Sequence, residues 1–313
     1  MSTSTLRIGH LSTFYHTALL LLDTRTLTPD CRIEWKLFPT GPAIVEAFEH
    51  GELDLAYIGL PPAIIGIAKG VPIKCVAGGH TEGTVMVGKK GSLCCTETNG
   101  LDKVFGQFRN GRMGVPGKGS IHDVILSSSI RVYGLEGAIE VINFKWADEI
   151  VERLAAGELD AALGTPALAV SAIRYAEARQ LCPAHALWPD NPSYGIVVNT
   201  DFLQNKRELV ENFLRLHEQA NDLIRNEPLR AASIVAATVG IVDSDFILDV
   251  FKLSPMYCSQ LSENYIKSTM QFVKVMADLG YTSEEIAESR IFDTTLISKV
   301  HPPGDHYGNG LTI

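Results

Sequence analysis

Residues 44–56 read IVEAFEHGELDLA, and residues 150–162 read IVERLAAGELDAA. Eight of the thirteen positions are identical, at an offset of 106 residues. The likeness extends upstream, where RIG at residues 7–9 faces RMG at residues 112–114. A period of this length is too long for a solenoid repeat. The repeat therefore predicts two lobes with the same local architecture.

Each copy has the pattern of a helix, a turn and a strand. In the first copy, Thr40-Gly41-Pro42 places a polar cap and a proline where a helix can begin. Apolar residues then follow at helical spacing, and Gly51 ends the helix. Residues 53–58 are mostly apolar, as expected of a strand buried in a parallel sheet.

The remaining pattern alternates strands with helices up to about residue 201, which predicts an α/β architecture. A helical region follows, at residues 206–225, 229–239 and 261–279, and we expect it to pack back on one lobe. The tail from His301 to Ile313 has an irregular pattern rich in proline and glycine. Further strands are predicted at residues 6–9, 32–38, 73–78, 112–115, 139–143 and 195–199.

Two α/β lobes joined by more than one chain crossing enclose a cleft, where ligands of such folds usually bind. The crossings are expected near residues 84–87 and 194–198. Lobe one is then discontinuous, with residues 1–86 and 198–313, the latter carrying the C-terminal helices. Lobe two is an insert of residues 87–197.

Composition excludes several classes of protein. The 313 residues carry a formal net charge of -9, which argues against a nucleic-acid binder with its basic stripe. No run approaches the roughly 20 apolar residues of a membrane helix, so no integral membrane segment is expected. The first residues lack the basic and apolar regions of a leader, so the sequence predicts no export. We expect a periplasmic or otherwise extracytoplasmic location if a leader was removed, and a cytoplasmic location if not. The sequence contains no feature that predicts the oligomeric state.

The six cysteines show no metal-binding or redox spacing. Only Cys94 and Cys95 are close in sequence, and adjacent cysteines seldom form a relaxed disulfide. We therefore expect buried or idle thiols, which favours a reducing compartment. His301 and His306 fall in the irregular tail, where no metal is expected.

Four segments together resemble a known family. They are GELDLAYIGLPPAIIGIAKGVPIKCVAGG at residues 51–79, RMGVPGKGSIHDVIL at 112–126, GELDAALGTP at 157–166 and IFDTTLISKV at 291–300. This combination resembles the substrate-binding proteins of ABC transporters of the nitrate/sulfonate/taurine type, a group that includes binders of pyrimidine precursors. The resemblance implies a type II periplasmic-binding-protein fold, with two lobes, a cleft and a helical C-terminal region.

The resemblance also implies where a ligand is held: by the loops after the first three strands of lobe one and by a helix N-terminus in lobe two. It places no cofactor, metal or catalytic residue. The second GELD unit and the crossing region add further positions. Carried over by position, the expected ligand-binding residues are Ser12, Thr13, Tyr15, His16, Thr40, Gly41, Gly59, Leu60, Pro61, His80, Thr81, Lys118, Gly119, Ser120, His122 and Thr165.

The segment Gly117-Lys118-Gly119-Ser120 fits an anion site on physical grounds. Ser120 and Asp123 have the spacing of a capping box, and a helix N-terminus attracts anions through free N–H groups. Lys118 would add a positive charge, whereas Asp123 and Glu82 near the same cleft would oppose a purely anionic ligand.

Four histidines, at positions 10, 16, 80 and 122, are expected at strand ends or loops facing the cleft. Such a group could bind a metal, donate hydrogen bonds or perform acid–base chemistry. His16 is the first choice among them. Tyr15 and Tyr57 could stack on a flat ligand, although Tyr57, inside a strand, also fits a core position.

Asp54 and Asp160 occupy equivalent places in the two GELD units, which favours a structural turn role over catalysis. The sequence contains no G-x-S-x-G elbow, Walker loop or H-E-x-x-H motif. These observations favour a binding protein over an enzyme.

The leading hypothesis is a binding protein that captures a small anionic or heteroaromatic ligand by closure of its lobes and presents it to an ABC permease. The alternative is a cytoplasmic enzyme on the same fold, of the thiamine-pyrimidine or menaquinone type. The absent leader, the thiols and the histidines favour the enzyme. Against it, Cys94-Cys95 is only a pair where the pyrimidine synthases carry a cysteine-rich cluster, and no motif of the menaquinone enzymes is found.

Overall fold

The computed structural model describes residues 4–11 and 13–312. The predicted strands are present, and the structure adds three that were not predicted, at Thr26–Thr28, Val85–Lys89 and Ala178–Cys182. The strands are β1 (Ser4–Leu11), β2 (Thr26–Thr28), β3 (Cys31–Phe38), β4 (Leu55–Ile58), β5 (Ile73–Thr81), β6 (Val85–Lys89), β7 (Arg112–Pro116), β8 (Glu140–Phe144), β9 (Ala161–Gly164), β10 (Ala178–Cys182) and β11 (Pro192–Asn199).

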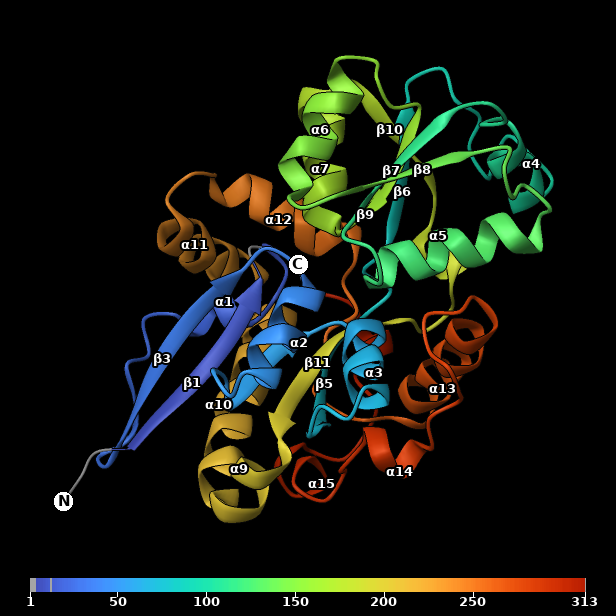
Figure 1. Cartoon of the computed structure of the whole chain (residues 1–313). Coiled ribbons are helices and arrows are strands. Elements are labelled where there is room, and N and C mark those ends of the chain that lie inside the picture. The colour runs from blue at the N-terminus through green and yellow to red at the C-terminus, as the bar shows by residue number, and fades with distance from the viewer. Residues whose placement is uncertain (1–3, 12, 313) are drawn as a thin grey trace.

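The strands form two sheets with helices packed around them (Figure 1). The first has the order β2-β3-β1-β4-β11-β5, and the second has the order β10-β6-β9-β7-β8. We call the parts of the chain around them the first-sheet half and the second-sheet half. The predicted α/β fold is confirmed, while the lobe boundaries at 86/87 and 197/198 remain a prediction.

The two sheets share one pairing pattern. β1 pairs in parallel with β3 and β4, as β7 does with β8 and β9. An antiparallel strand follows in each sheet, β11 beside β4 and β6 beside β9. The sequence repeat is thus a repeat of sheet topology. The sheets are mixed and not purely parallel, because each receives a strand where the chain crosses between the halves.

Helices cover both sheets. Three helices of the C-terminal region, Arg207–Asn226, Pro228–Val239 and Glu263–Asp278, fall where helical periodicity predicted them, whereas Ser244–Leu253 was not predicted. The helices are α1 (Ala18–Leu21), α2 (Gly41–Glu49), α3 (Leu60–Ala68), α4 (Leu101–Gly106), α5 (Ile121–Val132), α6 (Ala147–Ala155), α7 (Pro166–Tyr175), α8 (Ala184–Leu187), α9 (Thr200–Asn205), α10 (Arg207–Asn226), α11 (Pro228–Val239), α12 (Ser244–Leu253), α13 (Glu263–Asp278), α14 (Glu288–Ile291) and α15 (Ile297–Val300), with a 3₁₀ turn η1 (Tyr307–Asn309). Among the helices described, none combines the length and the hydropathy needed to cross a membrane.

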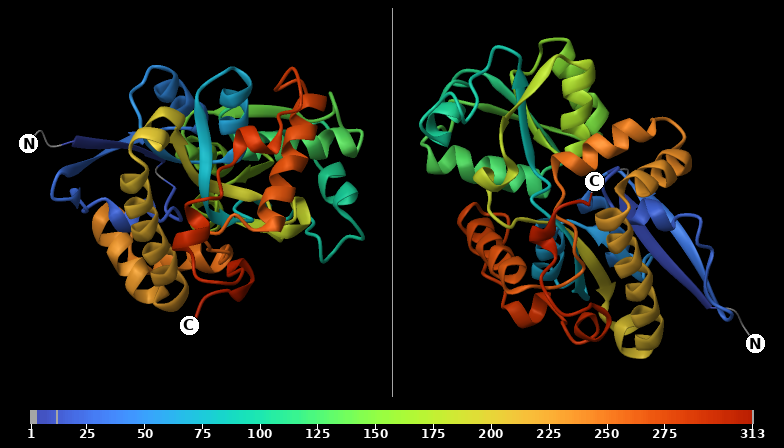
Figure 2. Two further views of the ribbon diagram at one scale, coloured as in Figure 1. Left: turned by 90° about the horizontal axis from the view of Figure 1, so that it is seen from below. Right: turned by 180° about the vertical axis from the view of Figure 1, so that it is seen from behind.

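The expectation that the C-terminal helices pack on one lobe is wrong. α12 lies against α7 of the second-sheet half (Figure 1), and Arg174 forms ion pairs with Asp243 and Asp249 there. Near α13, the Tyr281 hydroxyl donates to Asp123 Oδ2 over 2.7 Å. The last residues run back beside α10, where the Thr312 N–H donates to a carbonyl of that helix over 2.8 Å (Figure 2). The C-terminal region therefore joins both halves.

The two GELD units hold their sheets by the same contact, which confirms the structural role predicted for the aspartates. Asp54 Oδ2 accepts the backbone N–H of Arg7 over 2.8 Å, and Asp160 Oδ2 accepts that of Arg112 over 2.9 Å. The Arg7 guanidinium also binds Asp54, while Lys89 Nζ binds Asp160 at 2.7 Å. Each aspartate thus ties the start of one parallel strand to the start of the next.

The leucine of each GELD unit explains a glycine in the facing strand. A Cβ on Gly9 would lie 2.7 Å from Leu53 Cδ1, and a Cβ on Gly114 would lie 2.6 Å from Leu159 Cδ1. Such distances are well inside van der Waals contact, so a larger residue would displace the GELD leucine from its packing on the strand. The RIG and RMG triplets of the sequence mark these positions.

Substitution Asp54→Ala is expected to lower the free energy of unfolding by about 2–3 kcal/mol, because charge-assisted hydrogen bonds are lost at a buried site. Asp160→Ala should cost only about 1 kcal/mol, since its side chain is 35% exposed against 10% for Asp54. Urea unfolding of both variants measures the two free energies of unfolding. Equal losses of free energy would contradict the larger contribution assigned to the buried Asp54.

The prediction of idle thiols is wrong for two of the cysteines. Cys95 and Cys182 form a disulfide, with a Cα–Cα distance of 5.2 Å and a sequence separation of 87. Cys182 ends β10, which pairs with β6, and Cys95 lies on the segment leaving β6. The pairing of those strands brings the two cysteines together, and it cannot be read from local spacing. The cysteines therefore no longer favour a reducing compartment. The other four cysteines are buried thiols, as predicted: Cys31, Cys75, Cys94 and Cys258.

Candidate functional site

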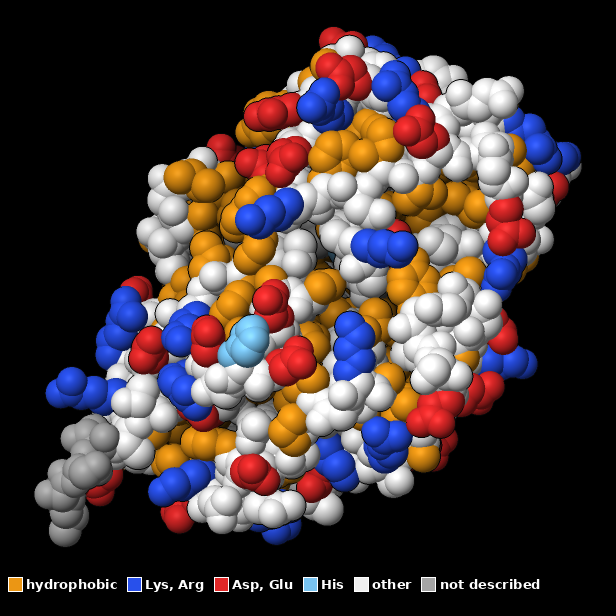
Figure 3. All heavy atoms as spheres, viewed as in Figure 1, with side chains coloured by type: hydrophobic (Ala, Val, Ile, Leu, Met, Phe, Trp, Pro, Cys, Tyr) orange, Lys and Arg blue, Asp and Glu red, His pale blue; other side chains and the backbone are white. Residues whose placement is uncertain are grey.

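A cavity of about 490 Å³ lies between the two halves. The space-filling view shows apolar side chains at the seam between the halves and charged side chains spread over the outer surface (Figure 3). The lining comes from loops that follow β1, β3 and β4 in one half and β7, β8 and β9 in the other. Because carboxyl ends of parallel strands meet at one edge of a sheet, these loops converge on the seam.

The structure brings together a large part of the predicted site. Thr13, Tyr15 and His16 come from the loop after β1, and Ser120 and His122 begin α5 on the other side. Ser12 lies outside the described residues, so its place is not assigned. The predicted residues that line the cavity are Thr13, Tyr15, His16, Thr40, Gly41, Gly59, Ser120, His122 and Thr165.

Other predicted residues lie outside the cavity lining. Leu60 and Pro61 are buried in the first turn of α3. His80 and Thr81 are buried at the end of β5, where His80 Nε2 donates to the Ser254 carbonyl over 2.8 Å. Both residues pack against the segment after α12, since the Thr81 N–H also donates to the Met256 carbonyl over 3.0 Å.

Lys118 and Gly119 serve the turn before α5. Lys118 is exposed and is not among the residues that line the cavity. Gly119 adopts a positive φ of 80°, which favours glycine, and its N–H donates to Asp123 Oδ2 over 2.7 Å. The expected cap is present, because Ser120 Oγ accepts the Asp123 N–H over 3.2 Å.

Asp123 and Glu82, expected to oppose an anion, do not line the cavity. The buried Asp123 carboxylate accepts bonds from Asn143 Nδ2 at 2.9 Å and from the Tyr281 hydroxyl. Burial raises the pKa of Glu82, which lies half-buried near the crossing to β6. Neither carboxylate therefore repels a ligand in the cavity directly.

Three of the four singled-out histidines, His10, His16 and His122, line the cavity. Burial lowers the pKa of each, and that of His122 falls to about 3. These rings are thus neutral near pH 7 and act as hydrogen-bonding groups. His122 Nδ1 lies 3.0 Å from Thr84 Oγ1.

His16 lies within an aromatic cluster at the base of the cavity. Its ring centroid is 4.7 Å from that of Tyr15 and 4.1 Å from that of Tyr194. Its Nδ1 has no hydrogen-bond partner among the described residues, and the same holds for Thr13 Oγ1 in this lining. Two lining residues therefore retain hydrogen-bonding capacity. Tyr57, in contrast, is fully buried, lies outside the lining and occupies a core position.

The helix start after β8 also lines the cavity, which was not predicted from the sequence. Lys145, Trp146 and Asp148 line the cavity, and Trp146 is the N-cap of α6. The repeat offset of 106 residues maps Thr40 onto Trp146, so the signal was present in the sequence. Of the residue types Lys, Arg, Asp and Glu, the described lining contains Lys145 and Asp148, and their charges are opposite.

Strand β11 of the first sheet and helix α11 supply further lining residues that no motif marked. Ser193 comes from β11, while Thr238 and Val239 end α11 and Ile241 follows it. Apolar side chains dominate the remainder. These are Leu11, Phe14, Leu19, Leu22, Leu37, Pro39, Pro62, Pro116, Ile121, Ala147, Val151, Ala167 and Leu168.

Several solved structures share this fold. The ligand-binding component of an ABC-type import system from Staphylococcus aureus, solved with zinc bound, gives a TM-score of 0.79 at 17% identity over 95% of this chain and 99% of that chain. The alkanesulfonate-binding protein SsuA from Xanthomonas axonopodis pv. citri, bound to MOPS, gives a TM-score of 0.75 at 18% identity, over 93% of this chain and 99% of that chain. The periplasmic nitrate-binding protein NrtA from Synechocystis PCC 6803 gives a TM-score of 0.75 at 13% identity, over 95% of this chain and 88% of that chain.

At these identities the likeness shows the fold, and the two-lobed fold implied by the family resemblance is confirmed. No curated protein sequence matches the chain. The model of the NMT1-like family matches residues 2–240, which is more than half of the 313 residues. The chain thus belongs to the NMT1-like family.

Proposed function

We propose that the protein is a solute-binding protein, which holds a small anionic or heteroaromatic ligand between its two halves for delivery to an ABC importer. The observation that carries this proposal is the cavity at the seam, lined by strand-end loops of both halves. Such a site closes around a ligand when the halves approach. Structural neighbours that are ligand-binding parts of import systems support the same function.

Within that class, the lining favours a flat heteroaromatic ligand over a compact anion. Phe14, Tyr15 and Trp146 offer aromatic faces, and neutral His16 and His122 offer hydrogen bonds. For a sulfonate or nitrate, the described lining offers one lysine, Lys145, and the negative charge of Asp148 offsets it. An acidic substituent of a heteroaromatic ligand would fit the helix N-termini that meet at the seam, those of α2, α5 and α7.

Native and denaturing mass spectra of the purified protein identify a retained ligand. A flat heteroaromatic mass that disappears on denaturation is the expected result. If the retained mass changes during incubation, the protein turns its ligand over and the binding assignment fails in favour of an enzyme. A clean unliganded mass leads to a thermal-shift screen with pyrimidines, sulfonates and nitrate, in which a bound ligand raises Tm.

Loss of the His16 ring is expected to weaken binding of the identified ligand by about tenfold or more, since one hydrogen bond in a dry site contributes about 1–2 kcal/mol. Calorimetric titration of His16→Ala and Trp146→Ala measures the loss. His50→Ala is the matched control, because His50 is exposed at the end of α2. Unchanged Kd in both lining variants would place the ligand elsewhere.

A further inference from the structure

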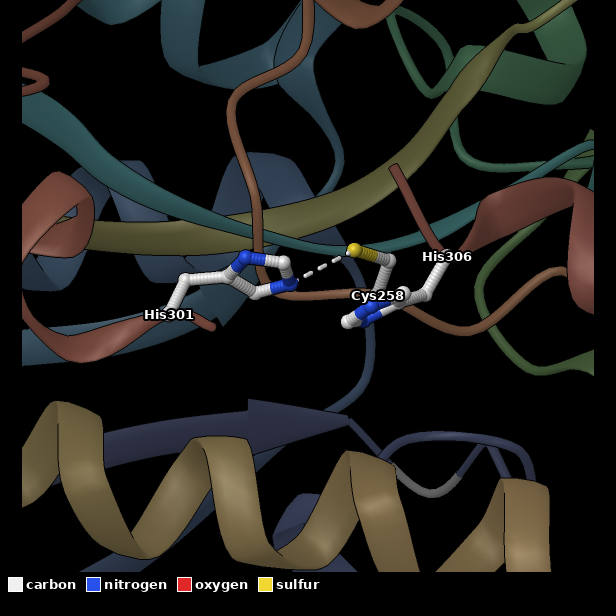
Figure 4. Close-up of side chains that lie close together, drawn as sticks. All are labelled: Cys258, His301 and His306. Carbon is white, nitrogen blue, oxygen red and sulfur yellow. Dashed lines mark hydrogen bonds between the residues drawn. The ribbon is translucent and has the colours of Figure 1, made fainter. Parts of the chain in front are cut away.

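Three metal-ligating side chains meet in a second place, which lies apart from the cavity lining. Cys258 comes from the segment between α12 and α13, His301 follows α15, and His306 precedes η1 (Figure 4). The Cys258 N–H donates to the Gly79 carbonyl of β5 over 3.4 Å. The cluster therefore lies on the first-sheet half, where the C-terminal tail is fastened to the sheet.

The donor atoms of the three side chains are close enough to share one ion. Cys258 Sγ lies 3.1 Å from His301 Nε2, and the two imidazole centroids are 4.8 Å apart. One ligand atom from each residue lies within 4.8 Å of the others. Two ligands of a tetrahedral zinc, bound at about 2.1–2.3 Å, lie roughly 3.5 Å apart. Small side-chain movements would give that geometry.

Apart from the turn η1, residues 301–312 have no helix or strand, as predicted, but the tail packs against the rest of the molecule. Cys258 is fully buried and His301 is 9% exposed. Between the histidines, Gly304 takes a φ of 115°, which turns the chain so that both rings face the same sulfur. The Tyr307 hydroxyl donates to the Gln260 carbonyl over 2.9 Å and holds the tail beside the cysteine segment.

The third ligand has an unsatisfied ring nitrogen. His306 Nδ1 is buried and has no hydrogen-bond partner among the described residues. A buried ring nitrogen without a hydrogen-bond partner costs free energy. A bound cation would remove that cost, because the nitrogen would then ligate the metal. This observation is independent of the Cys258–His301 contact.

Charged groups around the cluster balance one another. Glu218 Oε2 lies 3.8 Å from His301 Nε2, and Glu218 Oε1 lies 3.3 Å from the Arg225 guanidinium. The Ser259 hydroxyl also donates to Glu218 Oε2. Glu218 thus adds negative potential beside the ligands while its oxygens keep their own partners. Because Glu218 Oε2 faces the same His301 nitrogen as Cys258 Sγ, Glu218 is placed to supply a fourth ligand and not to bond the far ring nitrogen.

We propose that Cys258, His301 and His306 form a binding site for a zinc-class divalent ion. One thiolate and two imidazoles are the donor set that Zn²⁺ takes in proteins, and a soft sulfur disfavours Mg²⁺ and Ca²⁺. Binding releases the thiol proton to solvent, and water or Glu218 completes the fourth position. The ion would clamp the tail to the first-sheet half, independently of the solute in the cavity.

The test uses the full chain after treatment with a chelator. Zinc is titrated in competition with a chromophoric chelator, and Co²⁺ is added as a spectroscopic probe. One equivalent of zinc and a thiolate-to-cobalt charge-transfer absorption are expected. Cys258→Ser and His306→Ala should weaken zinc binding by more than roughly 100-fold. Glu218→Gln should weaken it less, because water can take the fourth position.

Matched controls separate this site from surface binding. Cys31→Ser removes another buried thiol, and His50→Ala removes an exposed imidazole. Both should bind zinc as the unmodified chain does. Near-ultraviolet circular dichroism without metal confirms that His306→Ala, the less buried ligand variant, is folded.

Two results would overturn the proposal. One is equal zinc affinity of the unmodified chain and folded His306→Ala. The other is Co²⁺ binding without a thiolate band. Either result would leave the Cys258–His301 contact as a hydrogen bond that fastens the tail.

Discussion

Reduction of the Cys95–Cys182 disulfide is expected to lower the free energy of unfolding by about 2–4 kcal/mol. The bond closes a loop with a sequence separation of 87, so the oxidised unfolded chain has far fewer conformations. It also fastens the segment leaving β6 to the end of β10, at the edge of the second sheet. Urea unfolding with and without dithiothreitol measures the difference.

A double variant, Cys95→Ala with Cys182→Ala, is the control for this measurement. It should unfold with the stability of the reduced chain and should not respond to the reductant. Cys94 is the neighbouring free thiol, and Cys94→Ser excludes exchange between the two sulfurs. If reduction leaves the urea midpoint of the unmodified chain unchanged, the disulfide contributes nothing to stability.

Acidification from pH 7 to pH 5.5 is expected to destabilise the protein steeply. Burial lowers the pKa of His80 and of His122 from 6.5 to about 3, and that of His217 to about 4. Below pH 6.5 the unfolded chain binds protons at these residues and the folded chain does not. Stability is therefore complete above pH 6.5 and falls by roughly 1.4 kcal/mol per pH unit for each histidine.

These three histidines alone give a slope approaching roughly 4 kcal/mol per pH unit, and His10 and His16, whose pKa burial also lowers, add to it. His80→Asn should reduce the slope by roughly 1.4 kcal/mol per pH unit, because the amide can still donate to the Ser254 carbonyl and does not titrate. His185→Gln is the matched control, since His185 is exposed and should leave the slope unchanged. A slope that is the same in the His80 variant and the unmodified chain would show that burial does not hold this ring neutral.

The repeated GELD units made the fold predictable. Their aspartates and leucines make the same contacts in both sheets. The local sequence match therefore marks structurally equivalent positions of the two sheets. β11 was predicted at residues 195–199, but the antiparallel strand β6 was not, and neither strand belongs to the repeated unit. Each is positioned by pairing with strands from distant parts of the chain.

The candidate site was predictable where it follows a strand of the first-sheet half, as for Thr13, Tyr15 and His16. It was not predictable for residues whose neighbours come from far along the chain. His80 occupies a strand end, as expected, but the segment carrying Ser254 covers it. The disulfide and the Cys258 cluster depend in the same way on long-range packing.

The order β4-β11-β5 has a consequence for how the chain is synthesised. β5 ends at Thr81, and its strand partner in the first sheet, β11, begins at Pro192. On a ribosome, β5 thus emerges more than a hundred residues before the strand that pairs with it. During that interval its apolar edge is exposed to other chains, the condition under which strands aggregate. The nascent protein therefore has its greatest need of a chaperone while the second sheet is being made.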